Sequence, residues 1–309
     1  MVAQAVAPEH ADPRAAALGP PYDRIVLLAV DIGNSTIKAA CFGASDAPSS
    51  VRAAATRRGM TADELDLLLA GLLSLDGVAF ADLSGIAAVS VVPQLTDALE
   101  AVARRRMGGR PLLLATSANL PLPIRVDHPN EVGADRLVDA YAAHRLHGGA
   151  LVVADVGTAV TVDAVGSDGA FLGGAIAAGP ALGLRALADH TAKLPHVPLA
   201  APPRAIGRDT VSALQSGAVY GWHDLVGGLV SRVRAELAEL EGVEPARVRT
   251  VMTGGFAAGP WARAIGVDIV DEHLTLKGLA HFAAYAIGTP ADAIAIPAAA
   301  IRARADAST

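Results

Sequence analysis

Two distant segments of this chain share one pattern, a short apolar run that ends in Asp-x-Gly and is followed by hydroxyl side chains. Residues 25–40 read IVLLAVDIGNSTIKAA, and residues 151–164 read LVVADVGTAVTVDA. Short apolar runs that are rich in β-branched residues and bounded by turn residues predict buried strands. A single Asp-x-Gly after a strand is an ordinary turn. Two copies in the same context indicate an internal repeat.

Both turns carry the groups that a phosphate chain and its metal ion need. Glycine lets backbone N–H donors approach phosphate oxygens closely. Hydroxyl groups add donors, and a carboxylate can hold the cation. The first turn offers Asp31, Gly33, Asn34, Ser35, Thr36 and Lys38, and the second offers Asp155, Gly157, Thr158 and Thr161. If the two turns face one another, they can hold a triphosphate from both sides.

The rest of the chain alternates predicted strands and helices, which is typical of an α/β protein. Further strands are expected over residues 85–92, 111–115 and 248–252, and helices over 62–75, 94–106, 135–147, 181–188, 211–240 and 276–287. Gly227 and Gly228 are a candidate kink in the helix over 211–240. The 309 residues suit two mid-sized domains. We predict a flexible extension over 1–23, α/β halves over 24–148 and 149–290, and a tail over 291–309.

Composition argues against several classes of protein. The formal net charge is -6, and the densest basic cluster is the run of arginines at 104–106, so nucleic acid is not an expected partner. The chain has one cysteine, Cys41, which excludes an internal disulfide and fits the cytoplasm. Because no apolar run reaches about 18 residues, a membrane span is not expected.

Two further segments hold candidate functional residues. VMTGGFA places Gly254 and Gly255 after a predicted strand, where glycines could lie flat against an adenine ring. EVGADRLVDA places Asp135 at a helix start, where the helix dipole favours the ionised carboxylate. Such a carboxylate can accept a hydroxyl proton during phosphoryl transfer. The alternative for Asp135 is a helix cap, with Arg136 in a surface ion pair.

Taken in order, these segments resemble a known family. The strings DIGNSTIK, GADR, DVGTAVTVD, GGAIAAG, TAKLP, IGRDT and TGGF occur in the order seen in type III pantothenate kinases. That family belongs to the actin-like ATPase superfamily. The resemblance covers residues 25–287. It implies a duplicated actin-like (ribonuclease H-like) α/β fold with a nucleotide cleft between its halves, and ATP-dependent phosphorylation of pantothenate, the first step of coenzyme A synthesis.

The resemblance also implies roles for individual residues. ATP would contact Asp31, Gly33, Asn34, Ser35, Thr36, Lys38, Thr158, Gly254 and Gly255. Pantothenate would contact Gly133, Ala134, Asp135, Arg136 and Thr210, with Asp135 as proton acceptor and Arg136 near the substrate carboxylate. Asp155 would hold a monovalent cation, K⁺ or NH₄⁺, and Asp31 is the candidate ligand of Mg²⁺. The family acts as a homodimer with its site near the subunit interface.

The chain departs from the family pattern at three positions. Ser35 replaces the usual threonine, Ala178 replaces a proline, and Val126 stands where many members have a substrate-contacting tyrosine. Val126 leaves open a kinase for another small hydroxyl compound. A nucleotide-binding regulatory protein without catalysis is a further alternative, although the candidate site residues are all retained. The apolar segment 173–184, GGAIAAGPALGL, is expected to be close-packed near the site and near a subunit interface.

Overall fold

The computed structural model describes residues 26–43, 47–257 and 265–288. The first sheet has the order β3-β2-β1-β4-β5. Its central strand β1 pairs antiparallel with β2 and parallel with β4. The strands are β1 (Leu27–Ile32), β2 (Thr36–Phe42), β3 (Val51–Ala55), β4 (Gly85–Ser90) and β5 (Leu112–Leu114). The predicted extension 1–23 and tail 291–309 lie outside the described residues.

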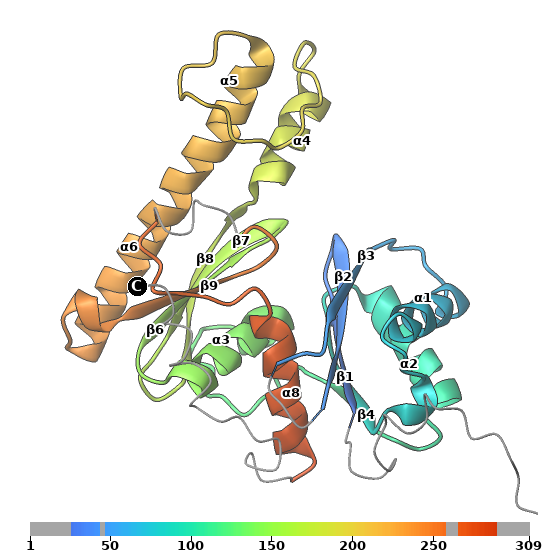
Figure 1. Ribbon diagram of the computed structural model, residues 1–309. Coiled ribbons are helices and arrows are strands. Elements are labelled where there is room, and N and C mark those ends of the chain that lie inside the picture. Colours follow the sequence, from blue (N-terminus) through green and yellow to red (C-terminus); the bar gives the residue numbers. More distant parts are fainter. Residues whose placement is uncertain (1–25, 44–46, 258–264, 289–309) are drawn as a thin grey trace, which may run out of the picture.

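The second sheet repeats the topology of the first. Read from its β8 edge, its order is β8-β7-β6-β9-β10, and β6 pairs antiparallel with β7 and parallel with β9. The strands are β6 (Leu151–Val156), β7 (Ala159–Val165), β8 (Phe171–Ala178), β9 (Arg249–Thr253) and β10 (Ile269–Val270). The two sheets stand side by side in Figure 1. The predicted duplicated α/β fold is therefore confirmed.

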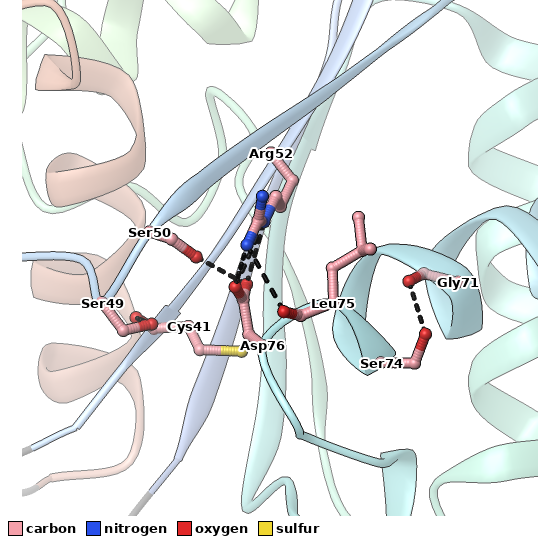
Figure 2. A network of polar contacts seen from close by, with 8 residues as sticks. All are labelled: Cys41, Ser49, Ser50, Arg52, Gly71, Ser74, Leu75 and Asp76. Carbon is pink, nitrogen blue, oxygen red and sulfur yellow. Dashed lines mark hydrogen bonds and ion pairs between the residues drawn. The ribbon is translucent and has the colours of Figure 1, made fainter.

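Helices α1 (Ala62–Ser74) and α2 (Pro93–Arg106) pack together on the outer face of the first sheet. A capping box fixes the start of α1, because Thr61 accepts a hydrogen bond from the Glu64 backbone and the Glu64 carboxylate accepts one from the Thr61 backbone. Figure 2 shows how the end of this helix is tied to the sheet edge: Arg52 of β3 forms an ion pair with Asp76. The network fixes the outer layer of the first half.

Two helices fill the space between the sheets. α3 (Ala134–His147) packs on β6 and β7 of the second sheet, and α8 (Leu274–Ala286) packs on β1 and β4 of the first. The helices pack against each other at Gly278, where a Cβ atom would lie 2.8 Å from Val138 Cγ1. The predicted division at residue 148 stays a prediction, since α8 follows the second sheet in sequence but packs against the first.

The remaining helices extend from the second sheet. They are α4 (Pro180–His190), α5 (Thr210–Ser216), a π-helical turn (Gly217–Gly221) and α6 (Trp222–Glu241). α6 continues through Gly227 and Gly228, and the irregular hydrogen bonding in this region is in the π turn before it, so the candidate kink at the two glycines stays a prediction. Short 3-10 helices lie at Phe80–Asp82, Pro129–Glu131 and Pro245–Arg247. No described helix has the length and apolar character needed to cross a membrane.

The segment expected to be close-packed forms an edge strand and a helix start. Residues 173–178 belong to β8, whose side chains alternate between partly covered and exposed, and Ile176 is 64% exposed. Only part of the prediction is therefore correct. Gly174 and Gly179 are tightly packed, because a Cβ at either would approach a backbone oxygen to within 2.2 or 2.3 Å. The other face of the strand is open.

Candidate active site

A cavity of about 400 Å³ lies between the two halves, at the ends of the central strands β1 and β6. Both Asp-x-Gly turns, the first residues of α3 and α8, and the glycines after β9 contribute to its wall. Its main polar lining comprises Asp31, Asn34, Ser35, Thr36, Lys38, Asp135, Asp155, Thr158, Thr161, Arg185 and Thr275, and its glycines are Gly33, Gly157, Gly254 and Gly255. The size suits a small-molecule ligand, for which pockets of roughly 300–1,000 Å³ are usual.

Hydrogen bonds within its own hairpin and with Thr56, which follows β3, fix the first turn. The Gly33 amide donates to the Thr36 carbonyl (3.0 Å), and the Thr56 hydroxyl donates to the Gly33 carbonyl (2.7 Å). The Thr56 amide donates to the Ser35 carbonyl (3.0 Å). These bonds fix the backbone of the turn, and the exposed Asn34 and Ser35 both line the cavity.

The second turn faces the first directly. Its Gly157 amide donates to the Ala159 carbonyl (2.9 Å), which closes the hairpin between β6 and β7. The Thr158 hydroxyl donates to the Ser35 hydroxyl (2.8 Å), so a single hydrogen bond joins the turns of the two halves. As expected from the sequence, the two turns lie opposite each other. A phosphate group between them could accept hydrogen bonds from both sides.

The two aspartates occupy equivalent places in the duplicated fold. Asp31 lies opposite Lys38 in the β1–β2 register, and Asp155 lies opposite Thr161 in the β6–β7 register. Burial raises the pKa of Asp31 to about 7, although the nearby Lys38 lowers it. Burial likewise raises the pKa of Asp155, to about 6. The charge of Lys38 opposes this increase, and the charge of Asp135 adds to it. One lysine therefore does not neutralise these carboxylates, and a bound cation would lower both pKa values.

Asp135 lies in the first turn of α3 and lines the cavity. The N-cap residue of this helix is Gly133, so the alternative in which Asp135 caps the helix is wrong. The Asp135 carboxylate accepts a hydrogen bond from the Arg136 amide (2.9 Å). The Asp135 carboxylate fits here because residue 133 is a glycine. A Cβ atom at that position would lie 2.6 Å from Asp135 Oδ1.

Arg136 is partly buried and paired inside the protein, which the sequence did not indicate. Its guanidinium forms an ion pair with Asp163 of β7, a side chain that is 2% exposed, and Arg136 Nε lies 3.2 Å from both carboxylate oxygens. The guanidinium also stacks over the Phe171 ring at 5.3 Å from its centroid. The expected surface ion pair is therefore wrong. The pair fixes the start of α3 to the second sheet.

The glycines after β9 approach Asp155 from the other side. Gly254 has a φ of 99°, and a Cβ there would lie 2.3 Å from Asp155 Oδ1 and 2.5 Å from the Val156 carbonyl oxygen. Only glycine fits this position. Gly255 has open space around it, and both glycines line the cavity. This flat wall is compatible with the predicted contact with an adenine ring.

Some predicted substrate residues lie away from this cavity. Gly133, Ala134 and Arg136 are not part of its wall, and Thr210 at the start of α5 lines a separate groove of about 800 Å³ between α4 and α5–α6. Ala178 lines the same groove. Val126 is packed near the Gly173 backbone, with its Cγ1 atom 3.5 Å from where a Cβ would stand. Within one chain, the structure therefore does not bring Thr210 into the cavity beside Asp135.

Three residues at or near the cavity lie outside the motifs that the sequence shows. Arg185 of α4 and Thr275 of α8 line it, and neither stands in a recognisable motif. Asp139 lies one turn after Asp135 and is 2% exposed, and its Oδ1 atom has no partner among the described residues. Burial, followed by the charge of Asp155, raises the pKa of Asp139 well above its usual value. The sequence signal for Asp139 was an acidic residue four positions after Asp135 on a helix face that is otherwise apolar.

The donor set suits a cation that is shared with phosphate. Among the described residues, no group of three His, Cys, Asp or Glu side chains could hold a metal ion by itself. Mg²⁺ is usually held by one or two carboxylates together with phosphate oxygens and water. The partly buried Asp31 and Asp155, with raised pKa values and one nearby lysine, fit that arrangement.

Two halves of ribonuclease H-like topology, with facing hydroxyl-rich turns at the ends of their central strands, are the arrangement expected of a nucleotide-binding protein with a duplicated α/β fold. The profile described as type III pantothenate kinase matches residues 27–232. The chain belongs to the type III pantothenate kinase family.

Individual relatives agree with this assignment. Type III pantothenate kinase of Moorella thermoacetica is 40% identical over 256 residues, which cover 82% of this chain and 97% of that protein. The enzyme of that name from Phenylobacterium zucineum is 40% identical over 254 residues, with 82% and 96% coverage. Among solved structures, a conserved putative Baf family transcriptional activator from Campylobacter jejuni superposes with a TM-score of 0.52 at 19% identity, over 84% of this chain and 99% of that one. The last likeness concerns the fold alone.

Proposed function

We propose that this chain transfers the γ-phosphoryl group of ATP to the hydroxyl group of pantothenate, giving 4′-phosphopantothenate and ADP in the first step of coenzyme A synthesis. The observation that carries the proposal is the pair of turns joined by Thr158 and Ser35, with Asp135 in the same cavity. Membership of the type III pantothenate kinase family supports pantothenate as the acceptor.

In this mechanism the triphosphate lies between the two turns. The amide and hydroxyl groups of residues 33–36 and of Thr158 donate to its oxygens, and Lys38 neutralises part of its charge. Gly254 and Gly255 form the flat wall beside the adenine ring. Because phosphoryl transfer passes through a loose transition state, positioning and charge neutralisation supply most of the catalysis. The hydrogen bond between the turns makes closure of the two halves part of this positioning.

Asp135 is the proton acceptor. The pantothenate oxygen attacks the γ-phosphorus, the bond from this phosphorus to the β–γ bridging oxygen breaks, and the hydroxyl proton passes to the Asp135 carboxylate. The Arg136–Asp163 ion pair holds the first turn of α3 in place, so the base keeps its position. The substrate carboxylate would meet the edge of the Arg136 guanidinium that Asp163 leaves open.

Two cations complete the proposed site. Asp31 would hold Mg²⁺ with the phosphate oxygens, and Asp155 would hold K⁺ or NH₄⁺. Both ions offset phosphate charge when bound. The raised pKa values of the two carboxyl groups support this proposal. Each aspartate lies close to other acidic side chains, and Lys38 is the cation that lowers the pKa of both.

A homodimer would complete the substrate site. Exposed apolar side chains lie along β8, α4, α5, the π-helical turn and α6, namely Ile176, Leu182, Leu187, Val211, Tyr220 and Leu225. Exposed apolar groups on neighbouring elements favour a protein partner, and most soluble oligomers are symmetric homo-oligomers. A second copy packed here would bring Thr210 toward a pantothenate site that a single chain leaves without it. The cytoplasm, where ATP is available and Cys41 stays reduced, is the expected compartment.

A coupled ADP-release assay tests the function. Purified protein is given ATP, Mg²⁺ and K⁺ with pantothenate or with a panel of small alcohols and sugars. Release with pantothenate alone supports the proposal. Release with another alcohol and none with pantothenate would favour the kinase for a different hydroxyl compound. Binding of ATP without turnover of any acceptor would favour the regulatory protein.

A further inference from the structure

A second cavity, of about 430 Å³, lies between the C-terminal turns of α3 and α8, and it shares no lining residue with the candidate active site. Tyr141, His144 and Arg145 of α3 line one side, and His281 and Tyr285 of α8 line the other. The remaining wall consists of Pro121, Leu122, Pro123, Asp168, Gly169 and Ala284. The volume is in the range of small-molecule sites, roughly 300–1,000 Å³.

The wall carries one arginine, Arg145, whose positive charge is not paired with an acidic side chain among the described residues. Among the described residues, no carboxylate or carbonyl oxygen is hydrogen-bonded to the Arg145 guanidinium. Asp168, the acidic residue of the wall, is already paired with Arg125. Burial, followed by the charges of Arg145 and Lys277, lowers the pKa of His281 to about 4. The imidazole is therefore neutral near pH 7 and can donate one hydrogen bond.

The chemistry of this wall selects a ligand class. A guanidinium that is free of carboxylates binds a carboxylate or a phosphate through two parallel hydrogen bonds. Tyr141 and Tyr285 contribute aromatic side chains to the same wall, and the proline-rich segment 121–123 contributes apolar ones. We propose that this cavity binds a small organic anion with a planar or apolar body, and that its occupancy changes the affinity of the active-site cavity for ATP.

The route of coupling is the packed pair of helices. Their other ends carry Asp135 and Thr275, which line the active-site cavity. Around Gly278 the helices touch closely, since a Cβ there would lie 2.8 Å from Val138 Cγ1 and 2.9 Å from the Ala142 Cβ. With so little space between them, the helices transmit a displacement at one end to the other. Binding at the two cavities is then linked, and the linkage is reciprocal.

The experiment is isothermal titration of the full chain with phenyl phosphate, with benzoate and with inorganic phosphate. Each titration is run with and without a saturating non-hydrolysable ATP analogue, which blocks the active-site cavity. We expect one site for phenyl phosphate or benzoate, weakened at least tenfold by Arg145→Gln. The matched control is Arg104→Gln, an exposed arginine on α2 that should leave binding unchanged. The analogue should shift the phenyl phosphate affinity several-fold without abolishing it.

Several results would overturn the proposal. These are no saturable binding of either organic probe, equal binding by Arg145→Gln, and complete loss of binding in the presence of the analogue, which would place the probe in the active site. Inorganic phosphate binding as tightly as phenyl phosphate would remove the role of the organic body. An unchanged affinity with the analogue bound would remove the coupling. The coupling rests on the proposed nucleotide site, whereas probe binding does not, so failure of the kinase assay alone leaves the cavity testable.

Discussion

The Thr158 hydroxyl donates a 2.8 Å hydrogen bond to the Ser35 hydroxyl, which lies 123 residues earlier in the chain. This bond joins the two halves at the place where each central strand ends. Without nucleotide, the hydroxyls satisfy each other. We expect that, when a nucleotide binds, each hydroxyl donates to a phosphate oxygen instead. The pair places one hydroxyl of each half at the same point of the cavity wall, and its removal should weaken ATP binding more than folding.

Thr158→Val should raise the KM for ATP by about tenfold or more, because a hydrogen bond to a charged group contributes roughly 1.5–3 kcal/mol. The melting temperature should stay near that of the wild type, since Thr158 is only partly buried. Steady-state kinetics and thermal denaturation measure both. Thr96→Val, which removes a hydroxyl on α2 far from the cavity, is the control. An unchanged KM would show that this hydroxyl does not contact the nucleotide.

Asp135→Asn should lower kcat by about 10²-fold or more, because it removes the proton acceptor while preserving the shape of the side chain. ATP binding should persist, since neither turn is altered. The melting temperature should change little, because the N-cap is Gly133 and the side-chain amide oxygen of the variant can still accept from the Arg136 amide. Asp97→Asn, at an exposed site on α2, is the control. A kcat within a few-fold of wild type would exclude Asp135 as the base.

Activity should require K⁺ or NH₄⁺, and Asp155→Asn should abolish this requirement together with most of the activity. The reason is that burial raises the pKa of the Asp155 carboxyl group to about 6, so the ionised form is costly in the ligand-free site and a bound cation would stabilise it. Rates are compared in potassium, ammonium, sodium and Tris buffers at constant ionic strength. Equal wild-type rates in all four would contradict the role of Asp155.

As the pH rises from about 4 to 7, Asp31 should lower the free energy of unfolding of the ligand-free protein. Its pKa is about 7 in the folded chain, against 3.8 for a free side chain, so in this window the folded state holds a proton that the unfolded state has lost. Asp31→Asn should flatten this part of the profile, while Asp97→Asn should not. Urea denaturation at pH 4.5, 6 and 8 measures the difference. Parallel profiles for wild type and Asp31→Asn would contradict the assignment.

Light scattering at micromolar concentration should give about twice the 31.2 kDa chain mass. Ile176→Glu should shift the protein toward the monomer, because it places a charge in the apolar surface of β8, α4 and α6. Leu67→Glu is the matched control: Leu67 is 72% exposed on α1, in the other half of the protein. A monomeric wild type, or equal dissociation by both variants, would remove the proposed interface.

Much of the fold was predictable because it depends on local patterns. The β-branched run before Asp31 and its equivalent before Asp155 identified both central strands, and leucines at helical spacing identified α1 within one residue. The mixture of small and apolar residues in 173–184 was misleading, because it fits a tightly packed loop and an edge strand equally well. The glycine pair Gly227–Gly228 does not interrupt α6, since glycine is tolerated inside a helix that packing stabilises.

For the candidate site, the chain alone determined which residue types follow each buried strand, and so which residues could meet a phosphate. It could not determine partners brought together by long-range packing. Three features depend on how α3, β7 and α5 pack. Asp163 forms an ion pair with Arg136, Asp139 is buried, and Thr210 lines a different groove. A strand or helix pattern is encoded within a few residues. The pKa of a carboxylate and the partner of an arginine depend instead on burial and on charges contributed by segments that are distant in the sequence.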